Sequence, residues 1–224
     1  MPATIAIDGP SASGKSTVGS LLAQRLGYDF LDTGVMYRAV AWLAHEREVD
    51  PNDAVALESL IRDAKFAVFP AEREGDETRV LVNDKDVTSS LREAAVEQTV
   101  SLVSRVPAVR TAMVRLQRKL ARNGRIVMVG RDIGTIVLPD AELKVYLNAS
   151  LAERARRRYE QVSPAGRHAG VRQVESDLAQ RDRIDSQRAA SPLRPAVDAV
   201  IINTDHLSLD EVVGSILNLI SEQP

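Results

Sequence analysis

The strongest constraint on the fold is a glycine-rich segment near the start of the chain, Gly9 to Thr17, which reads GPSASGKST. It follows TIAI at Thr4 to Ile7, an apolar run typical of a buried strand, and it precedes a predicted helix. A strand, a tight loop and a helix in this order match the phosphate-binding loop GxxxxGK[ST], in which backbone N–H groups surround phosphate oxygens. We therefore expect a nucleoside triphosphate to bind here.

Each part of this loop has a physical role. The lysine, Lys15, is expected to face solvent and to reach the β and γ phosphates, while the hydroxyl of Ser16 contacts Mg²⁺. An ordinary glycine-rich turn capped by Ser16 is the alternative, and the strand–loop–helix context argues against it. The residues assigned to ATP are Gly9, Pro10, Ser11, Ala12, Ser13, Gly14, Lys15, Ser16 and Thr17.

Further short apolar runs alternate with segments of helical length. Such alternation predicts an α/β fold with a mainly parallel sheet flanked by helices. The last helix has the clearest start, because Ser208 and Glu211 form a capping-box pattern, and its apolar face is expected to pack on the sheet. The three further predicted strands are RIVMV at Arg125 to Val129, LKVYL at Leu143 to Leu147, and VIIN at Val200 to Asn203.

Two segments interrupt this rhythm within what is otherwise one predicted domain, 1–224. About residues 65–92 read as a small inserted subdomain on the acceptor side, with two or three short antiparallel strands around the charged turn AEREGDE. About residues 151–188 are rich in arginine and contain the loop-prone SPAGRHAG at 163–170. This second segment is predicted to be a mobile, positively charged lid.

Composition excludes several classes of protein. The formal net charge of -2 provides no overall field to attract nucleic acid, and no apolar run approaches the roughly 18 residues of a membrane span. The chain has no cysteine and no leader pattern before the first strand, which favours the cytoplasm. Nothing demands more than a monomer. Arginine outnumbers lysine 24 to five, which fits either phosphate binding or a GC-rich genome.

The loop alone does not choose among nucleotide-binding proteins. A GTPase would carry a DxxG switch, yet no aspartate is followed three residues later by glycine, and NDKD at Asn83 to Asp86 has the wrong spacing for a base-reading motif. A motor ATPase usually has an acidic pair at the end of a buried strand, whereas Val127 to Val129 lead into Gly130-Arg131-Asp132. That tripeptide suggests binding of an acceptor.

Five motifs together make the chain resemble the bacterial cytidylate kinases, a family of nucleoside monophosphate kinases, over nearly its whole length. The family often has serine where Thr33 stands here, and threonine keeps the hydroxyl. The resemblance implies a P-loop kinase that transfers the γ-phosphoryl group of ATP to CMP or dCMP with the help of Mg²⁺. The motifs are IDGPSASGKST at 7–17, LDTGVMYR at 31–38, PAVR at 107–110, GRDIGT at 130–135 and RDRIDSQRAASPL at 181–193.

The resemblance also implies roles for individual residues. Lys15, Arg131 and Arg188 form the catalytic set, with Arg38 and Arg131 on the acceptor phosphate. Arg181, Asp185 and Arg188 fall at i, i+4 and i+7 on one predicted helical face, where the first two contact the sugar. A solvated ladder of ion pairs is the alternative for these three. The whole set assigned to CMP is Thr33, Tyr37, Arg38, Ser101, Arg110, Arg131, Asp132, Arg181, Asp185 and Arg188.

Three arginines of the predicted lid, Arg154, Arg157 and Arg158, could close on the phosphates of ATP. Glu153 and Arg157 could equally form a simple i, i+4 pair. The three histidines, His45, His168 and His206, lack the spacing of metal ligands.

The residues that recognise the nucleobase of the acceptor can be predicted from its hydrogen-bonding groups. Cytosine offers an N4 amino donor beside two acceptors, so a carboxylate next to a forked donor should read it, and Asp132 with Arg110 meets this need. Replacing Asp132 by Asn is then expected to shift selectivity towards UMP with little change in stability. The competing view makes Asp132 only a structural partner of Arg131. By resemblance, the hydroxyl of Ser101 supplies a third contact to the base.

Two other classes stay open at this point. One is a P-loop kinase for another small acceptor, and the other is a nucleotide-binding regulatory protein without turnover.

Overall fold

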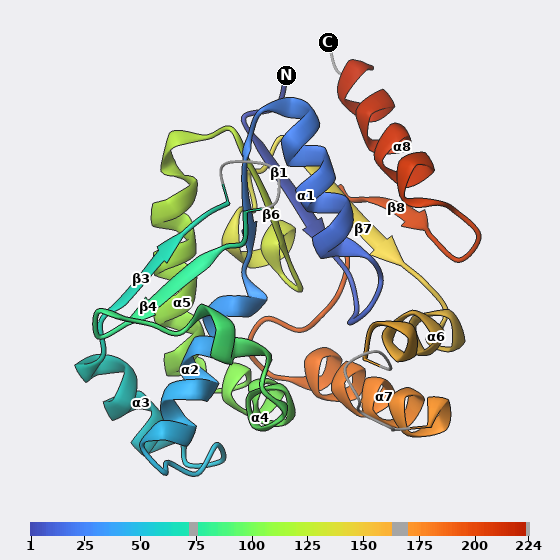
Figure 1. The fold of residues 1–224 in the computed structure, drawn as a ribbon. Helices are drawn as coiled ribbons and strands as arrows, with labels where there is room; N and C mark the ends of the chain where they lie inside the picture. The colour runs from blue at the N-terminus through green and yellow to red at the C-terminus, as the bar shows by residue number, and fades with distance from the viewer. Residues whose placement is uncertain (72–75, 163–169, 223–224) are drawn as a thin grey trace.

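The computed structural model describes residues 1–71, 76–162 and 170–222. Its centre is a five-stranded sheet in the order β2-β6-β1-β7-β8, in which every neighbouring pair is parallel (Figure 1). This confirms the predicted parallel α/β fold. The five strands are β1 (Thr4–Asp8), β2 (Asp29–Asp32), β6 (Ile126–Gly130), β7 (Leu143–Asn148) and β8 (Val200–Asn203).

Alternate residues of the central strands enter two separate hydrophobic cores, because successive side chains of a strand point to opposite faces. Ile5 and Ile7 of β1 pack with helices α1 (Lys15–Leu26) and α8 (Leu209–Ser221) on one face. Ala6 between them joins the core on the other face. Both faces are therefore covered, which explains why the strands read as continuous apolar runs.

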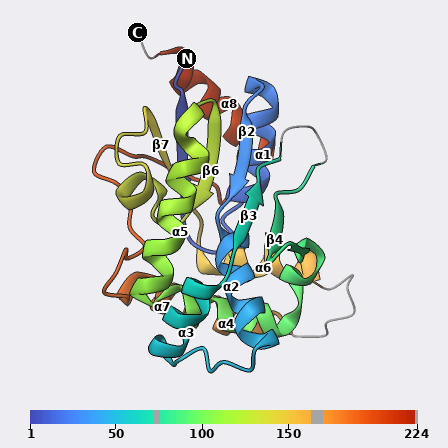
Figure 2. The same ribbon diagram turned by 90° about the vertical axis from the view of Figure 1, so that its left-hand side faces the viewer.

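The second face is covered mainly by α5 (Pro107–Leu120), which precedes β6. Figure 2 shows α5 in front of the sheet, α1 and α8 behind it, and α2 below it. The α8 capping box is present, since Ser208 and Glu211 bond as the sequence predicted. The hydrophobic core on this side continues into α2 (Gly34–Glu46), α3 (Ala54–Asp63), α4 (Ala94–Ser104) and the short turns η1 (Thr88–Arg92) and η2 (Ala121–Asn123).

The segment expected to form short antiparallel strands does so. Strands β3 (Phe66–Phe69), β4 (Arg79–Val82) and β5 (Lys85–Asp86) form a separate three-stranded antiparallel sheet. A bridge between Phe30 and Ala71 connects this region to β2. Of the charged turn AEREGDE, residues 72–75 lie outside the described residues.

Helices α6 (Leu151–Val162) and α7 (Val171–Gln187) form the arginine-rich region and pack against each other (Figure 1). Their small apolar core of Ala155, Val174 and Leu178 also receives Ala12 from the glycine-rich loop. The predicted loop SPAGRHAG lies outside the described residues except for Gly170. In the described part of the chain, no helix is long and apolar enough to span a membrane.

Asp8 connects the end of β1 to the turn that follows β6. Its side chain is 4% exposed, and its carboxylate accepts hydrogen bonds of 2.8 Å from the backbone N–H groups of Ile133 and Gly134. These groups begin the π-helical turn η3 (Ile133–Val137), so the carboxylate satisfies donors that the turn leaves without a partner. Burial raises the pKa of Asp8 to about 6, although both hydrogen bonds lower it.

The close packing of α1 on the sheet gives a test of the fold. A Cβ on Gly19 would lie 2.5 Å from Val129 Cγ1 and 2.9 Å from Phe30 Cε2, whereas a Cβ on Gly214 of α8 would meet nothing within 4 Å. We expect Gly19→Ala to lower the free energy of unfolding by about 1 to 3 kcal/mol and Gly214→Ala to raise it by up to about 1 kcal/mol. Urea unfolding at a constant m-value measures both, and shifts of the same sign would contradict this packing.

The burial of Asp8 predicts a pH dependence of stability. Between its ordinary pKa of 3.8 and its folded pKa of about 6, the folded chain binds more protons than the unfolded chain. The contribution of Asp8 is therefore fully present below pH 3.8 and is lost as the pH rises through 6. The unfolding free energy of the wild type minus that of Asp8→Asn should fall by roughly 1 to 3 kcal/mol between about pH 4 and 7. Urea unfolding of both proteins across this pH range measures the difference. A difference that stays constant or increases with pH would refute the raised pKa of Asp8.

Candidate active site

The glycine-rich loop connects β1 to α1 at the carboxyl edge of the sheet. Its backbone needs glycine: Gly9 has φ 151°, and a Cβ there would lie 2.1 Å from the Leu147 carbonyl oxygen. Gly14, with φ 92°, precedes α1, and no side chain caps that helix in the described structure. The first N–H groups of α1 are therefore available to an anion.

Lys15 corrects one expectation. We expected its side chain to face solvent, but the residue is 6% exposed, and its Nζ donates to the Pro10 carbonyl at 2.5 Å and to Ser13 Oγ at 3.4 Å. The ammonium folds back because these oxygens compensate its charge. Burial, and then the charge of Arg131, lower the pKa of Lys15. The side chain still borders the cavity described below.

Asp32 is a site residue that the sequence reasoning missed. It ends β2, and its Oδ2 accepts a 2.7 Å hydrogen bond from the hydroxyl of Ser16 on the loop. Its other oxygen accepts from the backbone N–H of Gly34. The signal in the sequence was an acidic residue after the apolar pair Phe30-Leu31, a run too short to be recognised as a strand.

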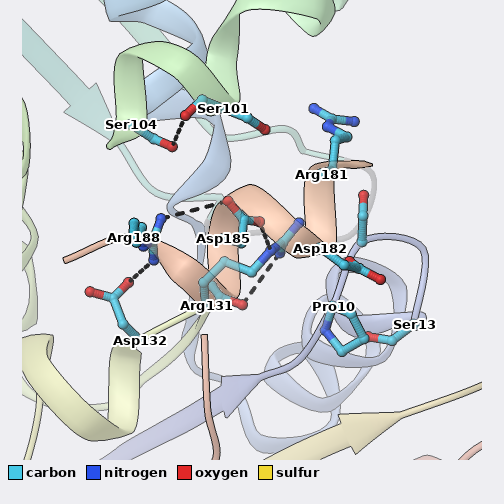
Figure 3. Close-up of polar contacts among 12 residues, drawn as sticks. Pro10, Ser13, Ser101, Ser104, Arg131, Asp132, Arg181, Asp182, Asp185 and Arg188 are labelled. Carbon is cyan, nitrogen blue, oxygen red and sulfur yellow. Dashed lines mark hydrogen bonds and ion pairs between the residues drawn. The ribbon is translucent and has the colours of Figure 1, made fainter. Parts of the chain in front are cut away.

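A buried cluster gathers several residues of the predicted acceptor site (Figure 3). Asp132, after β6, forms an ion pair with Arg110 Nη2 of α5, and its Oδ1 lies 3.7 Å from Arg188 Nη2. Arg110 Nη1 also donates to the Ser104 carbonyl at 3.2 Å. Asp132, Arg110, Arg188 and Ser101 are each between 3% and 8% exposed. A carboxylate beside a forked donor is therefore present, as base recognition would require.

The side chain of Arg131 points away from Asp132. Among the described residues, no contact between the two supports the alternative that Asp132 is only a structural partner of Arg131. Arg131 Nε instead lies 3.1 Å from Asp185 Oδ2 on α7 (Figure 3). The predicted helical face is partly wrong, because α7 ends at Gln187 and Arg188 is the residue that caps it. Arg188 Nη1 nevertheless lies 3.7 Å from Asp185 Oδ1.

Thr33 and Tyr37, two further residues of the predicted acceptor site, line the same region. Thr33 donates from its hydroxyl to the Val129 carbonyl at 2.9 Å, so the threonine found here is accommodated at the end of β6. The guanidinium of Arg110 lies 5.1 Å from the centre of the Tyr37 ring. Burial raises the pKa of Tyr37 to about 12.

Arg38 and two further arginines meet at Glu97 on α4, a residue that the sequence analysis did not single out. Arg38 Nε lies 2.7 Å from Glu97 Oε1, while Arg158 Nη2 and Arg181 Nη1 each lie 3.2 Å from Oε2. Burial acts to raise the pKa of Glu97, but Arg38, Arg181 and Arg158 together hold it at about 2. Glu97 is therefore ionised at any pH near neutrality.

The three predicted lid arginines point to three different places. Arg154 donates to the Ser11 carbonyl of the glycine-rich loop at 3.2 Å and pairs with Asp182 at 2.7 Å. Arg157 bonds to Thr204 as well as forming the simple i, i+4 pair with Glu153. Arg158 reaches Glu97, as described above. Of these three arginines, Arg154 alone forms a hydrogen bond to the loop among the described residues.

A cavity of about 870 Å³ joins these groups. The loop with Lys15 and Ser16 borders one part of it, and Arg110 with Asp132 borders another. Arg38, Arg131, Arg158, Arg181 and Arg188 line it as well. A site for a polyphosphate and a site for a second anionic molecule therefore open into the same space.

Comparison with known proteins agrees with this geometry. A family model described as cytidylate kinase matches residues 5–222. A cytidylate kinase of Roseiflexus castenholzii is 47% identical over 224 residues, covering 99% of this chain and 95% of the relative. One of Geobacillus kaustophilus is 48% identical over 220 residues, covering 98% and 97%.

A solved structure from Eubacterium ventriosum covers 98% of this chain and 99% of its own, with a TM-score of 0.53 at 11% identity, which supports the fold alone. The sequence relatives match the chain from end to end, and the motifs that suggested the resemblance form one site in the structure. The chain therefore belongs to the cytidylate kinase family and is an ATP-dependent enzyme of that family.

Proposed function

We propose that this enzyme transfers the γ-phosphoryl group of ATP directly, in line, to CMP or dCMP, giving CDP or dCDP and ADP. The observation that carries the proposal is the single cavity that joins the phosphate-binding loop to the buried pair of Asp132 and Arg110. The loop would hold the donor, and the pair would identify the base of the acceptor. Membership of the family argues against a regulatory protein without turnover.

Catalysis here is charge neutralisation and alignment. The phosphate of the acceptor has its second pKa near 6, so its attacking oxygen is already ionised at neutral pH and needs no strong base. Lys15, Arg131 and Arg188 stabilise charge on the transferring group, and Arg38 holds the acceptor phosphate. All four side chains border the cavity, which supports these roles.

Ser16 and Asp32 fit a magnesium ion. A hydroxyl and a carboxylate 2.7 Å apart are the hard oxygen ligands that this ion prefers. Among the described residues, no three histidine, cysteine or acidic side chains gather as a ready-made site, so the remaining ligands would come from nucleotide phosphates and water. When bound, the ion neutralises phosphate charge and orients the phosphates of ATP. Asp8 is unsuited to this role, since two backbone N–H groups occupy its carboxylate.

The base and the sugar are read by different residues. Asp132 accepts from N4 of cytosine, Arg110 donates to the acceptors of the ring, and Ser101 adds a second acceptor for N4. Arg181 and Asp185 contact the sugar hydroxyls, while Thr33 and Tyr37 complete the wall of the acceptor site. The burial of Asp132 and Arg110 supports selectivity, because a mismatched partner would leave both groups unpaired and out of water.

The arginines of α6 complete the donor site. Arg154 already contacts the loop, and Arg157 and Arg158 would join it when the region of residues 151–188 closes over ATP, which would exclude water from the transfer.

We place residues 65–92 as the acceptor-side subdomain of a single kinase domain. The absence of cysteine fits an enzyme that works in the cytoplasm. We propose that it acts as a monomer.

A coupled assay of ADP release tests the proposal with CMP, dCMP, UMP, AMP, GMP and shikimate as acceptors. We expect CMP and dCMP to give the highest kcat/KM, with UMP roughly 5- to 150-fold lower because its O4 would face the carboxylate of Asp132. Highest turnover with shikimate would identify a kinase for another small acceptor. No ADP release with any acceptor would reject the function.

Asp132→Asn tests the reading of the base. The added amide donor can face O4 of uracil, so the ratio of kcat/KM for CMP to that for UMP should fall by roughly 5- to 150-fold, equivalent to about 1 to 3 kcal/mol. An unchanged ratio would mean that Asp132 does not read the base. Because both substrates are measured with the same preparation, partial unfolding cancels from the ratio.

The burial of Asp132 changes the expected effect of Asp132→Asn on stability, for which the sequence alone predicted little change. Asp132 is 3% exposed between two arginines, and removal of one partner from a buried ion pair typically costs about 3 to 5 kcal/mol. Ser101→Ala is therefore a useful second variant, since it breaks no ion pair. For this variant, the ratio of kcat/KM for CMP to that for UMP should also fall, but by a smaller factor than for Asp132→Asn.

A further inference from the structure

Glu97 is the point at which three parts of the molecule meet. Its carboxylate on α4 binds Arg38 from α2, Arg158 from α6 and Arg181 from α7. Its side chain is 14% exposed, and it borders the cavity. The proposed function assigns Arg38 to the acceptor phosphate, Arg158 to the lid and Arg181 to the acceptor sugar. One carboxylate therefore holds guanidinium groups that substrates would otherwise use.

The charges show why such an anion is needed in the empty site. The charge of Arg38 is near enough to Arg181 to contribute to lowering its pKa, so these guanidinium groups repel each other. Glu97 is the one acidic side chain within ion-pair distance of Arg38, Arg158 or Arg181 in the described residues. Glu97 therefore occupies a position that favours any anion whose oxygens can contact several guanidinium groups at once. A phosphate group is such an anion.

We propose that Glu97 is an autoinhibitory anion, which occupies these arginines in the empty enzyme and which the phosphate of the acceptor must displace. The inference rests on the proposed function, because it takes the phosphate to bind Arg38. Arg38 is the contested group, because Glu97 Oε1 already lies 2.7 Å from its Nε, where the phosphate would bind. If Glu97 stayed on Arg38, the phosphate would share that guanidinium with a like charge nearby, which weakens binding.

Displacement has a consequence for selectivity between kinds of acceptor. A ligand that lacks a phosphate cannot compete for Arg38, so it leaves Glu97 on Arg38 and Arg158 and the link from α4 to α6 intact. A nucleoside monophosphate takes over Arg38 and frees Arg158 to follow α6. Glu97 thus makes the release of a lid arginine depend on the phosphate of the acceptor rather than on its base.

The competing interpretation is that Glu97 only braces the arginines in the correct position. The two interpretations predict opposite signs when the charge is removed. If Glu97 competes, its neutral variant binds CMP more tightly. If Glu97 braces, the freed arginines repel each other and move apart, so that the same variant binds CMP more weakly.

Calorimetry with CMP and with cytidine, on wild type and Glu97→Gln, separates these outcomes without requiring turnover. We expect the Kd for CMP to fall about tenfold in the variant, while the Kd for cytidine, which has no phosphate for Arg38 and gains only through Arg181, falls by no more than about twofold. Glu93→Gln is the matched control: it removes the same charge one turn earlier on an exposed residue, and it should change neither Kd by more than twofold. An unchanged or raised Kd for CMP in Glu97→Gln overturns the proposal.

Two further variants make the result specific. In an Arg38→Ala background, the gain from Glu97→Gln should shrink to about threefold or less, since the main contested guanidinium is gone. Glu97→Asp keeps the charge on a shorter side chain and should lower the Kd for CMP by an intermediate factor of about three, which tests the idea even if Glu97→Gln does not fold. No decrease in Glu97→Asp would then overturn it.

Failure of the inference differs from failure of the proposed function. If wild type neither binds CMP nor phosphorylates it, the function is wrong. If wild type does both but Glu97→Gln binds CMP no more tightly, the function stands and only the role of Glu97 is wrong.

Discussion

Positive charge gathered in a partly buried cavity is the constraint on which the site depends. Arginines that converge there repel each other and lose hydration, so an empty site is stable only if carboxylates balance them. Asp132 lies between Arg110 and Arg188, and Asp185 lies beside Arg131 and Arg188. Glu97 balances Arg38, Arg158 and Arg181. The empty enzyme therefore holds its arginines close together before any phosphate arrives.

The topology of the sheet brings these charges to one place. Parallel strands β1, β2 and β6 end at the same edge, so the glycine-rich loop, Asp32 and the turn with Arg131 all start from neighbouring positions. The carboxylate of Asp8 fixes their relation, because it ends the strand before the loop and accepts hydrogen bonds from Ile133 and Gly134. The proposed donor and acceptor sites thus start from one hydrogen-bonded edge of the sheet, and helices α6 and α7 follow β7 in the chain.

Local patterns predicted much of the fold and part of the site. Apolar runs identified β1, β6, β7 and β8, but β2 was missed because it has only four residues and begins and ends with Asp. The motifs predicted the arginines, yet not the anion that holds them. Glu97 lies 59 residues from Arg38 and 84 from Arg181 along the chain. Neither spacing nor periodicity reports contacts over such separations, and these depend on how α4 packs against α2 and α7.

The expectation for Lys15 was wrong, and the one for the stability of Asp132→Asn is revised, for a shared physical reason: both treated a charged side chain as though it stood in water. Lys15 turns back onto the carbonyl of Pro10, and Asp132 is enclosed by two guanidinium groups. The extent of burial also distinguishes the two carboxylates Asp132 and Glu97. Asp132, at 3% exposure, cannot leave its partners without stranding two buried charges, which suits a group that must present a fixed edge to a base. Glu97 is more exposed and shares its carboxylate among partly exposed side chains from three helices, so its replacement by a ligand phosphate would strand no fully buried charge. The two carboxylates therefore suit the different roles that we propose for them, Asp132 at the base and Glu97 at the phosphate.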